Sequence, residues 1–247
     1  MPALKVSGLT FSYGQKPLIR DLSFELRPGD FMCVLGPNGS GKSTLLKLLT
    51  GFMKAASGSV RLGGQEAASI APGRLARLAA YVASETATPY DFSVRETVLL
   101  GRTARAGLWR GYGADDGAAA GRAMEETGIA ALAGRSINTL STGERQLVFI
   151  AQALAQEAEV LLLDEPTSHL DLKYKSEIMA LLARLGRRGL AVAAVLHEPA
   201  LGRLGCNKAL ILNGGGEYSF GTAAEMLTAE RLAAAYGVPS DSPLLPK

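Results

Sequence analysis

The chain has 247 residues, of which 47% are hydrophobic and 20% are charged, and its formal net charge is +3. A chain of this length and composition can bury a full core, which excludes intrinsic disorder as its default state. The net charge is small and the arginines are scattered among alanines and glycines, so the sequence lacks the basic stripe typical of nucleic-acid-binding proteins, and nucleic acid is not an expected partner.

The cysteines and the hydropathy pattern bear on the compartment. Cys33 and Cys206 match no paired metal-ligand spacing, and Cys33 lies within an apolar run, where a buried free thiol in a reducing compartment is expected. No apolar stretch approaches the roughly 20 residues that span a bilayer, and residues 1–10 lack the core of a signal peptide. Any membrane association is therefore expected to be peripheral.

The first part of the chain has the pattern of strands. Residues 4–26 mix apolar and polar positions around a turn signal at Tyr13-Gly14, which predicts antiparallel strands. Residues 31–35 form a short, fully apolar run, which is typical of a central strand that is buried on both faces. An apolar helical run follows at 45–49.

The rest of the chain alternates between helical and strand patterns. Residues 86–155 lack strong strand runs, are rich in alanine, arginine and leucine, and contain a glycine-rich break at 111–117, so they predict an inserted helical subdomain. Apolar runs return at 160–164 and 191–196, each followed by a turn or a polar residue, as in parallel strands that deliver functional groups at their carboxyl ends. We therefore expect an α/β fold with a mostly parallel sheet, an N-terminal antiparallel β subdomain and an inserted α-helical subdomain.

A phosphate-binding loop is predicted directly after the strand at 31–35. The sequence fits the pattern G-x-x-x-x-G-K-[ST] and precedes a helix. Glycines let the backbone approach phosphate, the helix N-terminus offers free N–H groups, Lys42 neutralises phosphate charge, and Ser43 can ligate Mg²⁺. The alternative is an ordinary glycine-rich turn, which this strand–loop–helix context disfavours. The loop consists of Gly36, Pro37, Asn38, Gly39, Ser40, Gly41, Lys42, Ser43 and Thr44.

Two carboxylates end the apolar run at 160–164. Asp164 is the expected Mg²⁺ ligand, because a phosphate loop needs a carboxylate from a neighbouring strand end. Glu165 follows it and can act as the general base that activates the attacking water. The alternative is a carboxylate pair that merely terminates a strand.

A third motif, Ser141-Thr142-Gly143-Glu144, precedes a helix with apolar residues at helical spacing. Ser141 and Glu144 alone make a helix capping box, and this remains the alternative. However, the motif lies about twenty residues before Asp164-Glu165. In that position it resembles the LSGGQ signature loop of the ATP-binding cassette (ABC) family. Thr142 replaces the first glycine of that loop, and Glu144 replaces its glutamine. Gly143 is kept, and a glycine here still lets the backbone come close to a ligand.

The resemblance extends in order over nearly the whole chain and implies a P-loop NTPase core that binds ATP and Mg²⁺. It implies that Lys42, Glu165 and His197 are catalytic, and that Ser43 and Asp164 bind the metal. Tyr13 resembles the aromatic residue that stacks on adenine, although it can also simply cap a hairpin. His197 can likewise be a structural histidine at a strand end. His169 is expected to have no catalytic duty.

The family also implies partners. In this family, the signature loop of one subunit covers the ATP held by the other, which here implies Ser141, Thr142, Gly143 and Glu144. Asp171 is expected in the loop between subunits. A homodimer is therefore expected. The ATPase subunits bind transmembrane permease subunits at the cytoplasmic face of the cell (inner) membrane, and they serve an external substrate-binding protein indirectly. The implied nucleotide-binding core covers about 1–85 and 156–247, and the helical subdomain about 86–155.

One position departs from the family pattern. Residues 81–84 read Tyr-Val-Ala-Ser where family members typically read Tyr-Val-Pro-Gln, so Ser84 replaces the glutamine that touches Mg²⁺. A hydroxyl can reach the metal through water, which leaves Ser84 as a candidate metal ligand.

A narrower resemblance concerns the transported solute. Residues 92–102 and 221–239 are similar to importers of iron siderophores, haem and vitamin B12. The alternative for 92–102 is an amphipathic helix begun by a Ser93–Glu96 capping box. Trp109 and Tyr112 are candidate residues of the surface that meets the permease, or only local packing.

A soluble non-transport ABC ATPase and a slow nucleotide-gated binding switch remain the alternative functions. A guanine-nucleotide switch is disfavoured because Asn207-Lys208-Ala209-Leu210 lacks the aspartate of N-K-x-D.

Overall fold

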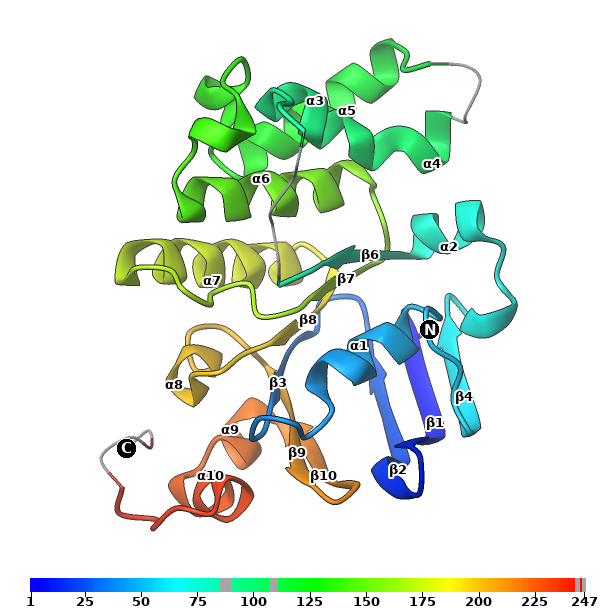
Figure 1. Ribbon diagram of the computed structural model, residues 1–247, viewed down its shortest axis with the longest axis vertical. Coiled ribbons are helices and arrows are strands. Elements are labelled where there is room, and N and C mark those ends of the chain that lie inside the picture. Colours follow the sequence, from blue (N-terminus) through cyan, green and yellow to red (C-terminus); the bar gives the residue numbers. More distant parts are fainter. Residues whose placement is uncertain (85–89, 107–110, 243–244, 246–247) are drawn as a thin grey trace.

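The computed structural model describes residues 1–84, 90–106, 111–242 and 245. Figure 1 shows sheets at the centre of the molecule, a group of helices from the middle of the chain at one end, and the C-terminal helices at the other. Within the described residues, no helix is long and apolar enough to cross a membrane.

The strands form two sheets. A four-stranded antiparallel sheet has the order β2-β1-β4-β5, and a six-stranded sheet has the order β10-β9-β3-β8-β7-β6. In the second sheet all neighbouring strands are parallel except β10, which runs antiparallel to β9. The strands are β1 (Leu4–Tyr13), β2 (Lys16–Leu26), β3 (Phe31–Leu35), β4 (Ser57–Leu62), β5 (Gln65–Glu66), β6 (Ala79–Val82), β7 (Val160–Leu163), β8 (Ala191–Val195), β9 (Lys208–Gly214) and β10 (Glu217–Thr222).

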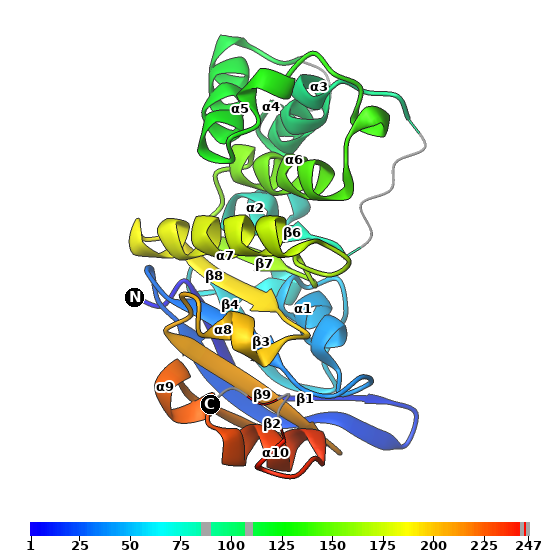
Figure 2. The ribbon, with the colours of Figure 1, turned by 90° about the vertical axis from the view of Figure 1, so that its left-hand side faces the viewer.

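The helices divide between the core and the insertion. Three of them, α3, α5 and α6, pack on one another, and Figures 1 and 2 show α7 between α6 and the sheet. The α-helices are α1 (Lys42–Leu49), α2 (Pro72–Leu78), α3 (Val94–Leu99), α4 (Thr103–Ala106), α5 (Ala114–Glu126), α6 (Thr142–Ala155), α7 (Leu172–Arg187), α8 (Pro199–Gly202), α9 (Ala223–Met226) and α10 (Ala229–Tyr236). Short 3-10 turns are η1 (Ala67–Ser69), η2 (Leu100–Arg102), η3 (Ala130–Leu132) and η4 (Ile137–Thr139).

Two hydrophobic cores lie on opposite faces of the parallel sheet. Because successive side chains of a strand point to opposite faces, Cys33 and Leu35 of β3 join the core built with α6 and α7. Val34, between them, joins the core built with α1 and the antiparallel sheet. A strand buried on both faces needs apolar residues at every position, which explains the uninterrupted run at 31–35.

The expected elements are largely confirmed. The N-terminal strands are antiparallel, the three apolar runs are parallel strands, and residues between β6 and β7 contribute helices. β7 and β8 each end one residue earlier than expected, which leaves Asp164 and Leu196 just beyond their carboxyl ends. Cys33 is a buried free thiol, as expected.

The glycine-rich break at 111–117 was predicted too long. Helix α5 begins at Ala114 and continues through Gly117. The Asp116 carboxylate accepts a hydrogen bond from the Gly113 N–H at 3.0 Å, and this closes the first turn of the helix. The break is therefore confined to the residues before Ala114.

Two sequence expectations fall on residues that the structure does not describe. The boundary expected between residues 85 and 86 lies outside the described residues, and so does Trp109. The second boundary, at 155–156, remains a prediction. Tyr112 is described, and its hydroxyl lies 2.9 Å from that of Thr103.

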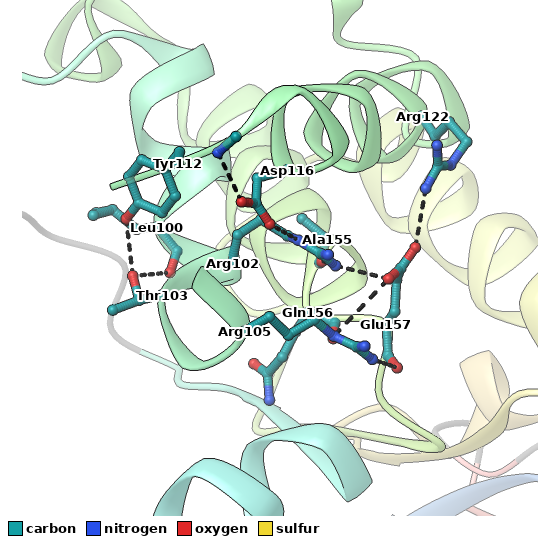
Figure 3. A network of polar contacts seen from close by, with 11 residues as sticks. Leu100, Arg102, Thr103, Arg105, Tyr112, Asp116, Arg122, Ala155, Gln156 and Glu157 are labelled. Atoms are coloured by element: carbon teal, nitrogen blue, oxygen red, sulfur yellow. Dashed lines mark hydrogen bonds and ion pairs between the residues drawn. The ribbon is translucent and has the colours of Figure 1, made fainter. Parts of the chain in front are cut away.

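Polar contacts tie the helical insertion to the end of α6 and the turn that follows it (Figure 3). Arg102 is buried, and its guanidinium donates to Asp116 Oδ1 at 2.9 Å and to Glu157 Oε2 at 2.7 Å. It also donates to the carbonyl of Ala155, while Arg105 donates to the carbonyls of Gln156 and Glu157. The arginines thus satisfy carbonyls that the end of α6 leaves free.

Candidate functional site

The phosphate loop connects the end of β3 to the start of α1. Gly36 and Gly41 have positive φ angles of 144° and 101°. A Cβ atom at Gly36 would lie 2.3 Å from the carbonyl oxygen of Leu212, and one at Gly41 would lie 2.9 Å from Cγ of Leu18. Both the backbone conformation and the close neighbours therefore require glycine at these two positions.

The loop is built to receive an anion. The Ser40 hydroxyl is buried and has no hydrogen-bond partner within the described residues. Lys42 Nζ is also buried and donates to the carbonyls of Gly36 and Pro37 at 2.8 and 3.0 Å. Burial lowers the pKa of Lys42, while Glu165 and Asp164 partly oppose the shift. An unpaired buried donor and an ammonium group held by two neutral carbonyls both fit a phosphate group.

The remaining loop residues frame this cradle. Asn38 and Gly39 are exposed at its tip, and Thr44 is half-buried in the first turn of α1. The hydroxyl of Tyr236, on α10, accepts a hydrogen bond from the Gly36 N–H at 3.1 Å. Sequence analysis missed Tyr236, because nothing in the C-terminal pattern marks it as a neighbour of the loop.

Asp164 reaches the loop from the end of β7, and β8 lies between β7 and β3, the strand that precedes the loop. Its side chain is only 3% exposed and accepts hydrogen bonds from Ser43 Oγ at 3.1 Å and Tyr81 Oη at 3.2 Å. Burial raises the pKa of Asp164, and the hydrogen bonds from Ser43 and Tyr81 oppose the shift. The two expected metal ligands thus lie in contact, and a hydroxyl beside a carboxylate fits Mg²⁺, which prefers oxygen ligands.

Tyr81 is a site residue that sequence analysis did not assign. It lies on β6, which pairs with β7, and burial together with Asp164 raises the pKa of its phenol. The phenol therefore stays protonated and donates to the carboxylate. A tyrosine at the end of an apolar run was the available signal. Ser84, three residues later, is exposed, and its metal role remains a prediction.

Glu165 and His197 lie together beyond the carboxyl ends of β7 and β8. His197 Nε2 is 2.6 Å from Glu165 Oε1, and the Ser168 hydroxyl donates to Glu165 Oε2 at 3.2 Å. Glu165 has a φ of 51°, which is uncommon for a residue other than glycine. A strained backbone is typical of functional sites.

The Ser141–Glu144 motif caps helix α6. The Ser141 hydroxyl accepts from the Glu144 N–H at 3.3 Å, and Glu144 Oε2 accepts from the Ser141 N–H at 2.9 Å. This backbone hydrogen bond is the main cause of the lowered pKa of Glu144. Ser141 and Thr142 are exposed, while Gly143 is buried. The capping box is therefore present, and it leaves the exposed N-terminus of α6 available to a partner.

One chain does not bring all the expected site residues together. Helix α6 packs in the core on one face of the parallel sheet, and α1 packs on the other face. Figures 1 and 2 show the sheet and α7 between these two helices. The helix that follows the motif at 141–144 and the helix that follows the phosphate loop of the same chain are therefore separated by the sheet. Asp171 is exposed and caps α7 by accepting from the Tyr174 N–H at 2.9 Å.

Tyr13 lies at the hairpin between β1 and β2. It is 61% exposed, its ring packs edge-on against Phe11 at 4.9 Å, and its hydroxyl contacts Met53 Sδ at 3.7 Å. It borders a shallow hollow lined also by Lys16 and Leu18, and Leu18 contacts the phosphate loop at Gly41. An exposed ring beside the loop is compatible with base stacking.

Comparison with known proteins decides the family. The family model described as "ABC transporter" matches residues 19–168, which is more than half of the chain. This chain belongs to the ABC transporter family. The family predicted from the sequence motifs and the fold class predicted with it are confirmed.

Individual relatives extend the match. The chain is 41% identical over 214 residues to the ABC transporter ATP-binding protein YvrA of Bacillus subtilis, covering 86% of this chain and 48% of YvrA, so it spans about half the length of that relative. It is 37% identical over 236 residues to the ferric enterobactin transport ATP-binding protein FepC of Escherichia coli, covering 95% of this chain and 87% of FepC. A solved structure of the inward-facing conformation of a metal-chelate type ABC transporter matches with a TM-score of 0.86 and 33% identity, covering 97% of this chain and 90% of that one.

Proposed function

We propose that this ABC protein hydrolyses ATP as the ATP-binding subunit of an importer of metal chelates of the iron siderophore, haem or cobalamin type. One observation carries the ATPase proposal: Lys42, Ser43 and Asp164 meet at the edge of the sheet where Glu165 and His197 also lie. The solute class is supported by the relatives named for ferric enterobactin transport and for a metal-chelate type transporter.

The phosphate loop binds the triphosphate in this proposal. Lys42 exchanges the carbonyls of Gly36 and Pro37 for phosphate oxygens, and the Ser40 hydroxyl gains its missing partner. Ser43 and Asp164 hold Mg²⁺, which when bound neutralises charge on the phosphates. Tyr81 fixes the orientation of Asp164 through the opposite carboxylate oxygen.

Hydrolysis requires a base for water. Glu165 accepts the proton of the attacking water, a role worth about 10² to 10⁴ in rate. Ser168 and His197 each contact one oxygen of Glu165 and so hold the carboxylate in place. His197 is also the residue proposed to contact the γ-phosphate.

A second copy of the chain completes the site. Because α6 and α1 lie on opposite faces of the sheet, the Ser141–Glu144 motif reaches ATP only from a facing subunit. The exposed N-terminus of α6 then presents its positive end and the Ser141 hydroxyl to the γ-phosphate, with Asp171 at the seam between subunits. ATP bridges the homodimer, and its hydrolysis removes the bridge.

The membrane partner is a permease. We place the homodimer peripherally at the cytoplasmic face of the inner membrane, bound to permease subunits that receive solute from an external binding protein. A hollow of about 730 Å³ between α2, β6 and the insertion, lined in part by Leu100 and Phe149, is the proposed contact for the permease.

Two experiments test these proposals. Purification of the tagged chain from membranes is expected to recover a polytopic permease; recovery of only ribosomes or DNA would contradict transport. ATPase assays with Lys42→Ala as the control test hydrolysis.

The slow-switch alternative rests on Ser84, whose short, exposed side chain replaces a glutamine. Equal slow rates of ATP hydrolysis in the wild type and in Glu165→Gln would favour this alternative.

A further inference from the structure

Gly143 lies against the aromatic ring of Tyr174. A Cβ atom built at Gly143 would lie 2.2 Å from Cγ of Tyr174, and 2.3 and 2.6 Å from its two Cδ atoms. These distances are far shorter than any contact that carbon atoms tolerate, so the ring fills the space that a larger side chain would need. Gly143 is buried beneath it.

Backbone conformation does not explain this glycine. Gly143 is the second residue of α6, and it is not among the described glycines with positive φ. In a helix, glycine is less favourable than alanine. The position of the Tyr174 ring therefore accounts for the glycine within the chain itself, apart from any need to approach phosphate.

Tyr174 lies in the first turn of α7. Its backbone N–H donates to Asp171 Oδ1 at 2.9 Å, and this hydrogen bond caps the helix. Lys173 Nζ lies 5.4 Å from the ring centroid, and the ring packs against the larger hydrophobic core. Asp171, Tyr174 and Gly143 thus form a direct chain of contacts from the start of α7 to the start of α6.

We propose that Tyr174 is a positioning residue that sets the first turn of α6 against the start of α7. Through it, one helix cap fixes the placement of both elements that the proposed function puts at the dimer seam, Asp171 and the Ser141–Glu144 motif. Its effect on catalysis rests on the proposed function; the contact itself does not.

The first test is a cycle of variants measured by thermal unfolding without nucleotide. Gly143→Ala is expected to lower the melting temperature by roughly 4 to 8 °C, because the added methyl displaces the ring. In the Tyr174→Ala background the same substitution is expected to leave the melting temperature unchanged or to raise it, since alanine is the better helix former. An equal loss in both backgrounds would overturn the proposed contact.

The second test measures positioning with Glu165→Gln protein, in which the proposed function expects ATP-dependent dimers to accumulate because hydrolysis is slowed. Tyr174→Ala is expected to raise the ATP concentration for half-maximal dimerisation about tenfold, because the motif is displaced. Binding of ATP to the monomer is expected to stay unchanged, since the phosphate loop packs on the other face of the sheet. Tyr174→Phe keeps the ring and is expected to dimerise like the parent.

The outcomes separate the inference from the proposed function. If the Tyr174→Ala variant dimerises at the same ATP concentration as the parent, the positioning role is overturned and the proposal of an ATP-bridged dimer stands. If the parent forms no ATP-dependent dimer, the proposed function fails, and the positioning role at a dimer seam fails with it. The thermal unfolding measurements still test the contact between Gly143 and Tyr174. A loss of ATP binding by the Tyr174→Ala monomer would show general damage and would also overturn the positioning role.

Discussion

His197 Nε2 lies 2.6 Å from Glu165 Oε1, although the two residues follow different strands of the parallel sheet. The other carboxylate oxygen accepts from Ser168 at 3.2 Å. Both oxygens of Glu165 are thus held by residues of the same edge, and its backbone has a φ of 51°. A carboxylate fixed in this way has a defined direction for receiving a proton from water.

Glu165→Gln is expected to lower kcat for ATP hydrolysis by about 100-fold or more, because an amide cannot take the proton. ATP affinity is expected to be retained, since the phosphate loop is untouched. Glu177→Gln, on the exposed side of α7, is the matched control and is expected to hydrolyse ATP at the wild-type rate. Steady-state phosphate release and equilibrium ATP binding measure the two effects; equal kcat values for Glu165→Gln and the wild type would contradict the role of the base.

Ser40→Ala is expected to stabilise the nucleotide-free protein and to weaken ATP binding. A buried hydroxyl without a partner costs about 1 to 3 kcal/mol, and the substitution removes it. In the proposed function the same hydroxyl binds phosphate, so ATP affinity is expected to fall roughly tenfold. Urea unfolding and equilibrium ATP binding measure the two changes.

Thr50→Ala is the control for this pair of effects. The Thr50 hydroxyl is buried at the end of α1 but donates to the carbonyls of Leu46 and Lys47. Its loss is expected to destabilise the protein and to leave ATP affinity unchanged. Destabilisation by Ser40→Ala comparable to that by Thr50→Ala would contradict the unpaired state of Ser40.

The sequence predicts best where local pattern and tertiary role coincide. The run at 31–35 is apolar at every position because β3 is buried on both faces, and the loop after it has fixed glycine spacing because backbone and phosphate must meet. Asp164 and Ser43 could be assigned to one metal because parallel strands deliver their ends to one edge. The observed contact of 3.1 Å agrees with that reasoning.

The residues that support the site could not be predicted in the same way. Tyr81, Tyr174 and Tyr236 act through contacts with residues at least 31 positions away in sequence, and a lone tyrosine has no spacing rule that reports such a contact. The extent of α5 was misjudged for a related reason. Glycine content indicated a break, but one carboxylate, that of Asp116, closes the first turn.

Asp164→Asn is expected to raise the melting temperature of the metal-free protein near neutral pH by roughly 2 to 4 °C. Burial raises the pKa of Asp164, so the folded state binds this proton more tightly than the unfolded state. As pH rises from the ordinary aspartate pKa through the raised value, unfolding free energy is therefore lost, and the loss is complete above the raised pKa. The asparagine variant does not titrate, so its advantage is expected to vanish as pH falls below the ordinary aspartate value.

Thermal unfolding of both proteins from about pH 3 to about pH 8 measures this difference. Comparing the two proteins at the same pH cancels the contribution of the other carboxylates to the pH dependence of stability. An advantage that is constant across the range would contradict the assignment to Asp164. Addition of Mg²⁺ and ATP is expected to stabilise the wild type more than Asp164→Asn, since the variant lacks the proposed metal ligand.

Arg102→Met is expected to destabilise the protein by roughly 2 kcal/mol, which corresponds to about 4 to 8 °C in melting temperature. The substitution keeps the length of the side chain but leaves the carboxylate of Asp116 and the carbonyl of Ala155 without their buried donor (Figure 3). Arg27→Met is the control, because Arg27 pairs with Glu25 on the exposed surface and such pairs contribute little. Thermal unfolding of both variants measures the contrast. Equal melting temperatures for Arg102→Met and Arg27→Met would contradict a stabilising role for the buried contacts of Arg102.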